Sequence, residues 1–169
     1  MTKHSVLFVC TGNICRSPTA EGVARGLAQQ RGLGSRFHFE SAATHGYHVG
    51  DPPDPRTLRA ARNRGYDLSA QRARRVTEFD FERFDLVLAM GYDHLDWLRR
   101  ACPRRHHGKL RLFLSYVDGD LAGEVPDPYY GGIDGFEEVL DLVEAAAARM
   151  LQELTDPPDA VPPAGSAIK

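Results

Sequence analysis

Residues 9–18, Val-Cys-Thr-Gly-Asn-Ile-Cys-Arg-Ser-Pro, restrict the possible folds of this chain more than any other segment does. The apolar run from Ser5 to Val9 predicts a buried strand, and Ser17 with Pro18 predicts a capped helix start with a proline in its first turn. A loop that leaves a strand and enters a helix turns its backbone N–H groups inward, and the N-terminus of the helix adds its positive end to the same site. The segment therefore predicts a binding site for a dianion.

Cys10 stands at the end of the predicted strand, at the bottom of this site. The field that attracts an anion also favours thiolate over thiol, so Cys10 is a candidate nucleophile. Gly12 and Asn13 tolerate the positive φ that a tight loop requires, and Arg16 is placed at the mouth. The alternative is a buried Cys10 that packs as a small apolar residue, with Arg16 in solvent. Because one mechanism needs all of these features together, we favour the anion site.

Composition limits the remaining classes of function. With 169 residues and 42% hydrophobic content, the chain suits one globular domain with a proper core. The net charge of -2 gives no general attraction to nucleic acid or to an anionic membrane. Three cysteines, an odd number, argue against a disulfide framework and for a cytoplasmic location. No apolar stretch approaches the roughly 20 residues that cross a bilayer, so we expect no membrane insertion.

Strand-like and helical segments alternate along the chain. We expect strands at 6–9, 37–40, 85–90 and 110–114, a helix at 18–30 that ends near Gly32, and a longer helix from Asp134 to Leu151. This alternation predicts an α/β fold: one three-layer domain with a parallel sheet, helices on both faces and an anion-binding loop after the first strand. The domain spans residues 1–154, and residues 155–169, rich in proline, are expected to form a flexible tail.

Asp127 lies in a second informative segment, which follows the fourth predicted strand and can reach the same sheet edge as Cys10. Prolines at 126 and 128 restrict its backbone, as suits a carboxyl group held over a site. Asp127 is therefore a candidate general acid. Taken alone, Asp127 is better explained as an ordinary turn aspartate beside proline, and its candidacy depends on the other segments.

These segments resemble the low-molecular-weight protein tyrosine phosphatases, in the bacterial form of the family. The resemblance rests on residues 10–18, Ser41-Ala-Ala, residues 49–56 (Val-Gly-Asp-Pro-Pro-Asp-Pro-Arg) and Asp127-Pro-Tyr-Tyr-Gly, and it covers residues 4 to about 154. It implies a four-stranded parallel sheet flanked by helices, a phosphocysteine intermediate, and neither a metal nor another cofactor.

The resemblance assigns roles to individual residues. Cys10 would attack phosphorus, Arg16 would clamp the phosphate, and Asp127 would act as general acid and then general base. Ser17 would donate to the sulfur, and Asn13 would brace the loop, partly through Ser41. The full set of loop and supporting residues implied is Thr11, Gly12, Asn13, Ile14, Cys15, Ser17 and Ser41.

Substrate choice is expected to follow from the depth of the pocket. The phosphate of phosphotyrosine lies about one ring farther from the backbone than that of phosphoserine, so a slot walled by aromatic residues selects it. The family's wall positions are Tyr47, Tyr129 and Tyr130 here, and His48 beside them could contact the peptide. Expected partners are phosphotyrosine proteins or peptides and a tyrosine kinase that acts on Tyr129 or Tyr130. We expect a monomer or a weak dimer.

One departure from the family concerns Gln71, which stands where the family often has a histidine that supports the phosphate loop. Gln71 can donate and accept a hydrogen bond but cannot become charged. Cys15 is implied to form a reversible disulfide with Cys10 that protects the nucleophile from oxidation. We interpret Cys102, with His106 and His107, as a solvated basic turn and not as a metal site.

Two alternative functions stay open at this point. A thiol-linked arsenate reductase resembles this family, but it relays electrons through two further cysteines after the third strand, and residues 79–96 contain none. A phosphotyrosine-binding module without turnover would usually lack the nucleophile or the acid, whereas Cys10 and Asp127 are both present.

Overall fold

Strand β1 (His4–Cys10) lies inside a four-stranded parallel sheet in the computed structural model, which describes residues 3–117, 123–129 and 132–156. It pairs with β2 (Phe37–Ala43) on one side and β3 (Leu86–Ala89) on the other, and β4 (Leu110–Leu112) follows β3 at the edge. Residues 6–9 of β1 are fully buried, as an inner parallel strand requires. The predicted parallel sheet is confirmed.

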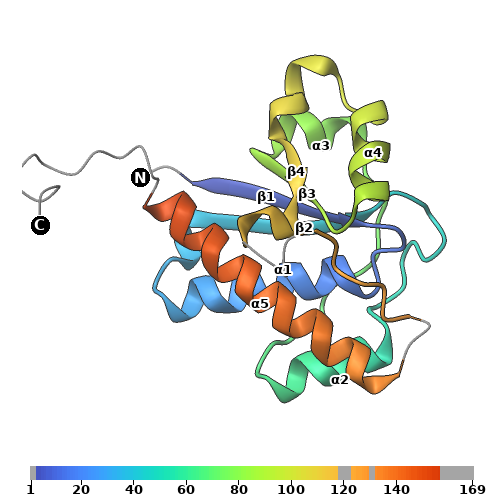
Figure 1. Ribbon diagram of the computed structural model, residues 1–169, viewed down its shortest axis with the longest axis vertical. Helices are drawn as coiled ribbons and strands as arrows, with labels where there is room; N and C mark the ends of the chain where they lie inside the picture. Colours follow the sequence, from blue (N-terminus) through green and yellow to red (C-terminus); the bar gives the residue numbers. More distant parts are fainter. Residues whose placement is uncertain (1–2, 118–122, 130–131, 157–169) are drawn as a thin grey trace, which may run out of the picture.

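Helices cover both faces of the sheet (Figure 1). One face carries α1 (Arg16–Gln30), α2 (Pro55–Asn63) and α5 (Ile133–Thr155), and the other carries α3 (Glu78–Arg83) and α4 (Tyr92–Ala101). Short 3-10 helices η1 (Gly34–Arg36), η2 (Arg104–Lys109) and η3 (Phe113–Tyr116) connect these elements. The three-layer α/β prediction is confirmed.

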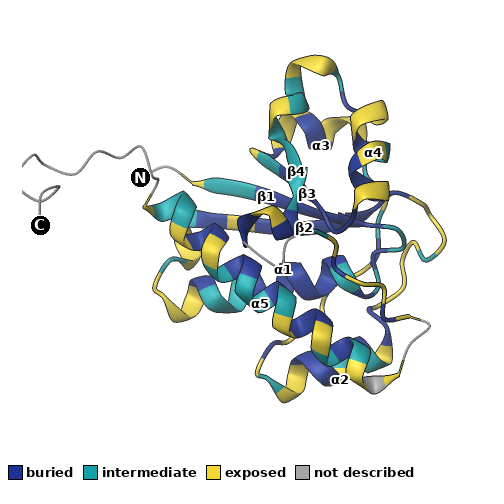
Figure 2. Ribbon diagram, in the orientation of Figure 1, coloured by how far each residue is buried: buried dark blue, intermediate teal, exposed yellow. Residues whose placement is uncertain are grey.

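Alternate residues of β1 face opposite layers, as the period of a strand dictates. Val6 and Phe8 belong to the hydrophobic cluster under α1 and α5, whereas Leu7 and Val9 belong to the cluster under α3 and α4. The buried residues accordingly follow the strands and the inner faces of the helices (Figure 2). The strand that leads to Cys10 is thereby held from both sides.

Two local predictions are wrong. Helix α1 begins at Arg16 with Cys15 in the N-cap position, so Ser17 is not the cap; its hydroxyl is instead bonded to Cys10 and Asn13. The fourth strand ends at Leu112 and not at residue 114, because the chain enters η3 there and buries Phe113 and the residue after it in the core.

The carboxyl ends of the parallel strands meet at one edge of the sheet, and the N-terminal end of β1 and the last turn of α5 lie at the other (Figure 1). Helix α5 continues to Thr155, one residue past the predicted domain boundary, and the predicted tail from residue 157 onward lies outside the described residues, as does Tyr130. Among the described helices, none has both the length and the apolar character that a bilayer-spanning segment needs.

Candidate active site

Asn13 holds the loop between β1 and α1. Its φ of 60° lies in the left-handed region, which asparagine tolerates better than most residues. Its side-chain nitrogen Nδ2 donates to Ser17 Oγ (2.8 Å) and to Ser41 Oγ (2.9 Å), and its Oδ1 accepts from the backbone N–H of Arg74 (3.1 Å). The hydrogen bond to Ser41 is the one expected from the sequence. The loop is thus fixed to α1, to β2 and to the segment before α3.

Cys10 lies at the bottom of this loop and is almost fully buried. Its Sγ is 2.9 Å from Ser17 Oγ. Because Asn13 already donates to that oxygen, the Ser17 hydroxyl proton is available to the sulfur. A hydrogen bond donated to sulfur stabilises its charged form more than its neutral form. The site therefore supplies a partner for a thiolate at Cys10.

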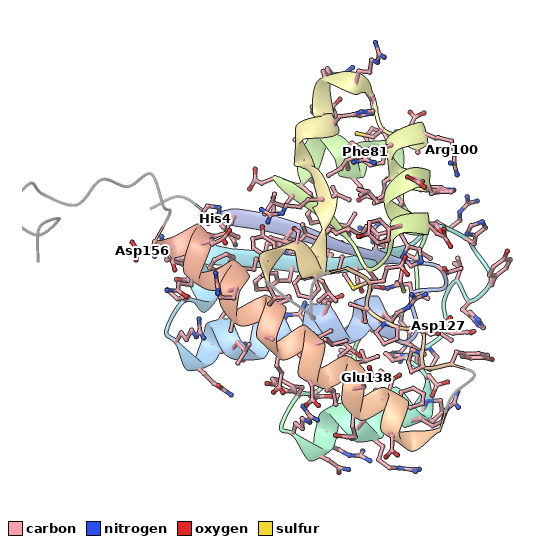
Figure 3. The ribbon with its side chains drawn as sticks, viewed as in Figure 1. His4, Phe81, Arg100, Asp127, Glu138 and Asp156 are labelled. Carbon is pink, nitrogen blue, oxygen red and sulfur yellow. The ribbon has the colours of Figure 1, made fainter. Side chains whose placement is uncertain are left out.

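Arg16 faces Asp127 across the opening of the loop. Arg16 Nη2 lies 3.7 Å from Asp127 Oδ2, and Arg16 Nη1 donates to the backbone oxygen of Val125 (3.3 Å). The Arg16 side chain is 12% exposed and that of Asp127 is 46% exposed. Figure 3 shows Asp127 at the sheet edge where β1 ends. The carboxyl group is therefore both near the guanidinium and open to solvent.

A cavity of about 240 Å³ joins these residues. Tyr47, which is 73% exposed, and Tyr129 stand at its wall, with His48 between the loop and Tyr129. Gly12 leaves room for His48, because a Cβ at Gly12 would lie only 3.0 Å from the His48 ring. The complete lining is Cys10, Thr11, Gly12, Asn13, Ile14, Cys15, Arg16, Tyr47, His48, Asp127 and Tyr129. Of the predicted residues, Ser17 and Ser41 lie behind the loop, where both are buried.

Glu21 supports the loop from behind and was missed by the sequence analysis. Ser41 Oγ donates to Glu21 Oε1 (2.7 Å), and Arg25 donates to Glu21 Oε2 (2.6 Å). Gln71 donates its Nε2 to the backbone oxygen of Pro18 (3.0 Å), in the first turn of α1. The sequence signal for Glu21 was a carboxylate near the start of the predicted helix at 18–30, where a buried charge requires a partner.

Arg56 and Glu124 position the loop that carries Asp127. Asp54 caps α2 and pairs with Arg56, whose Nη2 donates to the backbone oxygen of Tyr129 (3.1 Å). At the other end of the loop, Glu124 Oε1 accepts from the N–H of Tyr92 (2.7 Å), the first residue of α4. The carboxylate thereby satisfies a free N–H at a helix start. The loop is therefore tied to both layers of helices.

The three cysteines are all free, and their surroundings differ. Cys15 is buried in the wall of the cavity, and burial raises the pKa of its thiol to about 12. Cys102 is buried in the core under α4, so its prediction as part of a solvated turn is wrong. Across residues 3–117, 123–129 and 132–156, no group of three or more His, Cys, Asp or Glu side chains could hold a metal ion.

The fold and the site define an α/β protein whose first strand delivers a cysteine into an anion pocket closed by an arginine and faced by a carboxylate, the arrangement expected of a phosphatase. Residues 5–158 match the family described as Low molecular weight phosphotyrosine protein phosphatase. The chain belongs to this family, and the resemblance stated from the sequence is confirmed.

Individual relatives agree with this assignment. The chain is 48% identical over 153 residues to the Low molecular weight protein-tyrosine-phosphatase of Streptomyces coelicolor, covering 88% of this chain and 92% of that protein. Two crystal structures have the same fold. The first is a protein tyrosine phosphatase from Entamoeba histolytica, with a TM-score of 0.88 and 36% identity, covering 91% of this chain and 98% of that one. The second is YfkJ from Bacillus subtilis, with a TM-score of 0.87 and 38% identity, covering 94% of this chain and 99% of that one.

Proposed function

We propose that this protein hydrolyses phosphotyrosine in proteins, and small aryl phosphates, through a phosphocysteine intermediate. The observation that carries the proposal is one cavity that holds Cys10 at its bottom and Arg16 and Asp127 at its opening, 3.7 Å apart. A nucleophile, an anion clamp and a proton donor are the three groups that cleavage of an aryl phosphate requires. Family membership supports the same activity.

In the first step, the phosphate dianion enters the loop, where Arg16 and the backbone N–H groups hold its oxygens. Cys10 Sγ attacks phosphorus, so the S–P bond forms as the bond to the aryl oxygen breaks. Asp127, protonated, gives its proton to that oxygen. In the second step, Asp127 as carboxylate takes a proton from water, which attacks phosphorus. The S–P bond breaks, and the Ser17 hydroxyl stabilises the departing sulfur.

The wall of the cavity supports phosphotyrosine over phosphoserine. Tyr47 and Tyr129 stand above a nucleophile that is almost fully buried, so the phosphate must be carried on a long, flat side chain to reach it. Tyr130, the third wall position expected from the sequence, lies outside the described residues. A partner kinase, a cytoplasmic location and a monomeric or weakly dimeric state stay predictions from the sequence.

The test measures release of phosphate from aryl phosphates in the presence of a chelator. We expect wild type to be active, Cys10→Ser to be inactive, and Asp127→Asn to lose most activity with poor leaving groups, because good ones need little protonation. Two matched controls should keep activity. Cys102→Ser replaces a buried cysteine away from the cavity, and Asp156→Asn replaces an exposed aspartate at the end of α5. An inactive wild type, or turnover by Cys10→Ser, would show the mechanism to be wrong.

Peptides that differ only in the phosphorylated residue test the substrate class. We expect the phosphotyrosine peptide to be hydrolysed at least tenfold faster than the phosphoserine peptide, and Tyr47→Ala to reduce that ratio. Reduction of arsenate to arsenite with a thiol donor would favour the reductase instead. Binding of the phosphotyrosine peptide without turnover would favour the binding module.

We also propose that Cys15 protects Cys10 during oxidation, since both line the same cavity. Peroxide would oxidise the two thiols to a disulfide, and a reducing thiol would restore them. After treatment with peroxide and then reductant, wild type should recover activity, whereas Cys15→Ser should accumulate sulfinic acid at Cys10, detected by peptide mass spectrometry. Equal recovery of both proteins would contradict this role.

A further inference from the structure

Three hydrogen bonds fix the chain at Cys10 and Thr11, the nucleophile and the residue after it. The backbone oxygen of Cys10 accepts from the N–H of Thr44 (2.9 Å), and that of Thr11 accepts from the N–H of His45 (3.1 Å). The third involves the Thr11 hydroxyl, which lies 2.8 Å from His94 Nε2. The first two contacts continue the pairing of β1 with β2, whereas the third comes from α4. The catalytic scheme above does not use His94.

His94 is buried and uncharged at neutral pH. It lies in the first turn of α4 and is 5% exposed. Burial, with the nearby charge of Arg16 as the next cause, lowers its pKa to about 4. At neutral pH the imidazole therefore carries one N–H, and Nε2 or Nδ1 must hold it.

The surroundings of the two ring nitrogens select between these tautomers. His94 Nδ1 is buried and has no hydrogen-bond partner in the part of the chain that the structure describes. It also lies in the first turn of α4, where the helix dipole is positive, which favours a lone pair over an N–H. A buried donor without a partner is rarer than a buried acceptor without one. The proton is therefore on Nε2, which donates to Thr11 Oγ1.

We propose that His94 is a positioning residue of the phosphate loop, which holds Thr11 through this hydrogen bond so that the Thr11 N–H stays directed at the bound phosphate. The proposal rests on the proposed function, since it assumes that the loop binds phosphate. His94 does not line the cavity that holds Cys10, so its contact with the loop is through Thr11. Replacement of the His94 imidazole is expected to lower the affinity of the loop for phosphate while the fold remains intact.

The test compares His94→Leu, which removes the donor, with His94→Gln, whose amide N–H can reach Thr11. Binding of inorganic phosphate is followed by NMR titration, a measurement that needs no turnover. We expect His94→Leu and Thr11→Val each to weaken binding about tenfold, and the double variant to be no weaker than either single variant. His94→Gln and Thr11→Ser should stay within about threefold of wild type. His4→Gln, at the opposite end of β1, is the control for losing an imidazole.

Additive losses in the double variant, or wild-type phosphate affinity in His94→Leu, would overturn the proposal, as would ¹⁵N chemical shifts that place the His94 proton on Nδ1. If His94→Leu fails to fold, Thr11→Val and Thr11→Ser carry the comparison. If wild type hydrolyses no aryl phosphate but its phosphate affinity responds to these variants as expected, the proposed function fails and the positioning role stands.

Discussion

Asn13 combines a left-handed backbone conformation with three side-chain hydrogen bonds, and substitutions can separate the two contributions. Asn13→Gly and Asn13→Ala both lose the hydrogen bonds, so we expect each to lower the free energy of unfolding by at least about 2 kcal/mol. Alanine should cost about 1 kcal/mol more than glycine, because its Cβ disfavours positive φ. Urea unfolding measures both, with the exposed Asn63→Ala as control. An alanine variant as stable as the glycine variant would contradict the backbone argument.

His94 makes the stability of the protein depend on pH. Its folded pKa, about 4, lies below the ordinary value of 6.5, so the unfolded chain binds a proton between these values that the native state does not. The free energy of unfolding should therefore be highest above pH 6.5 and fall as the pH drops toward 4. From pH 7 to pH 5 the contribution of His94 amounts to about 2 kcal/mol.

This contribution is measured as the difference between wild type and His94→Gln in urea unfolding at the two pH values. Because the Gln side chain cannot take up the proton, the free energy of unfolding of the variant should fall by about 2 kcal/mol less than that of wild type between pH 7 and pH 5. Equal pH dependence of the two proteins would mean that His94 is not held neutral in the native state.

At the scale of elements, the approach of α1 to the chain after α2 depends on a glycine. A Cβ at Gly22 would lie 2.6 Å from Leu68 Cδ2 and 3.1 Å from its Cγ, and Leu68 is buried. Alanine is the better helix former by up to about 1 kcal/mol, but overpacking of a core costs about 1–3 kcal/mol. We therefore expect Gly22→Ala to lower the melting temperature. Gly135→Ala in α5, where the nearest atom is 3.6 Å away, should leave it equal or raise it. A stabilised Gly22→Ala would show that α1 can move aside.

The start of α1 shows why local patterns place elements better than they place side chains. Ser17 and Pro18 predict a helix start, and the helix does begin within two residues of the predicted position. The capping role predicted for Ser17 is wrong, because its hydroxyl is hydrogen-bonded to Asn13 and to the Cys10 sulfur, the partner that the resemblance implied. Propensity describes a residue in isolation, whereas the loop assembles its own hydrogen bonds.

At the scale of the whole molecule, the sheet was predictable because apolar runs of strand length are typical of strands that are buried inside a parallel sheet. The contacts that support the loop could not be predicted in this way. Thr11 and His94 are 83 residues apart in the chain, and Ser41 and Glu21 are 20 apart. No periodicity links such pairs, and only the resemblance to the family suggested that Asn13 meets Ser41. The loop residues were thus accessible from the sequence, whereas His94 needed the assembled fold.

The inner position of β1 has a consequence for how activity is lost under stress. Cys10 ends a strand that is bonded on both sides and buried on both faces, so it should open only with the whole domain. The Asp127 side chain is exposed, and its loop lies outside the sheet and the helices and is held mainly by contacts near its ends. Such segments open at lower cost.

In urea below the unfolding midpoint, we therefore expect hydrolysis of poor leaving groups to fall first, while phosphate binding and hydrolysis of good leaving groups persist. Rates with both kinds of aryl phosphate, and phosphate affinity by NMR, measure this order across one urea series. A parallel decline of all three would mean that the two loops open together. If hydrolysis of poor leaving groups falls first, there is a range of urea concentrations in which the protein still binds phosphate but no longer delivers a proton to the departing group.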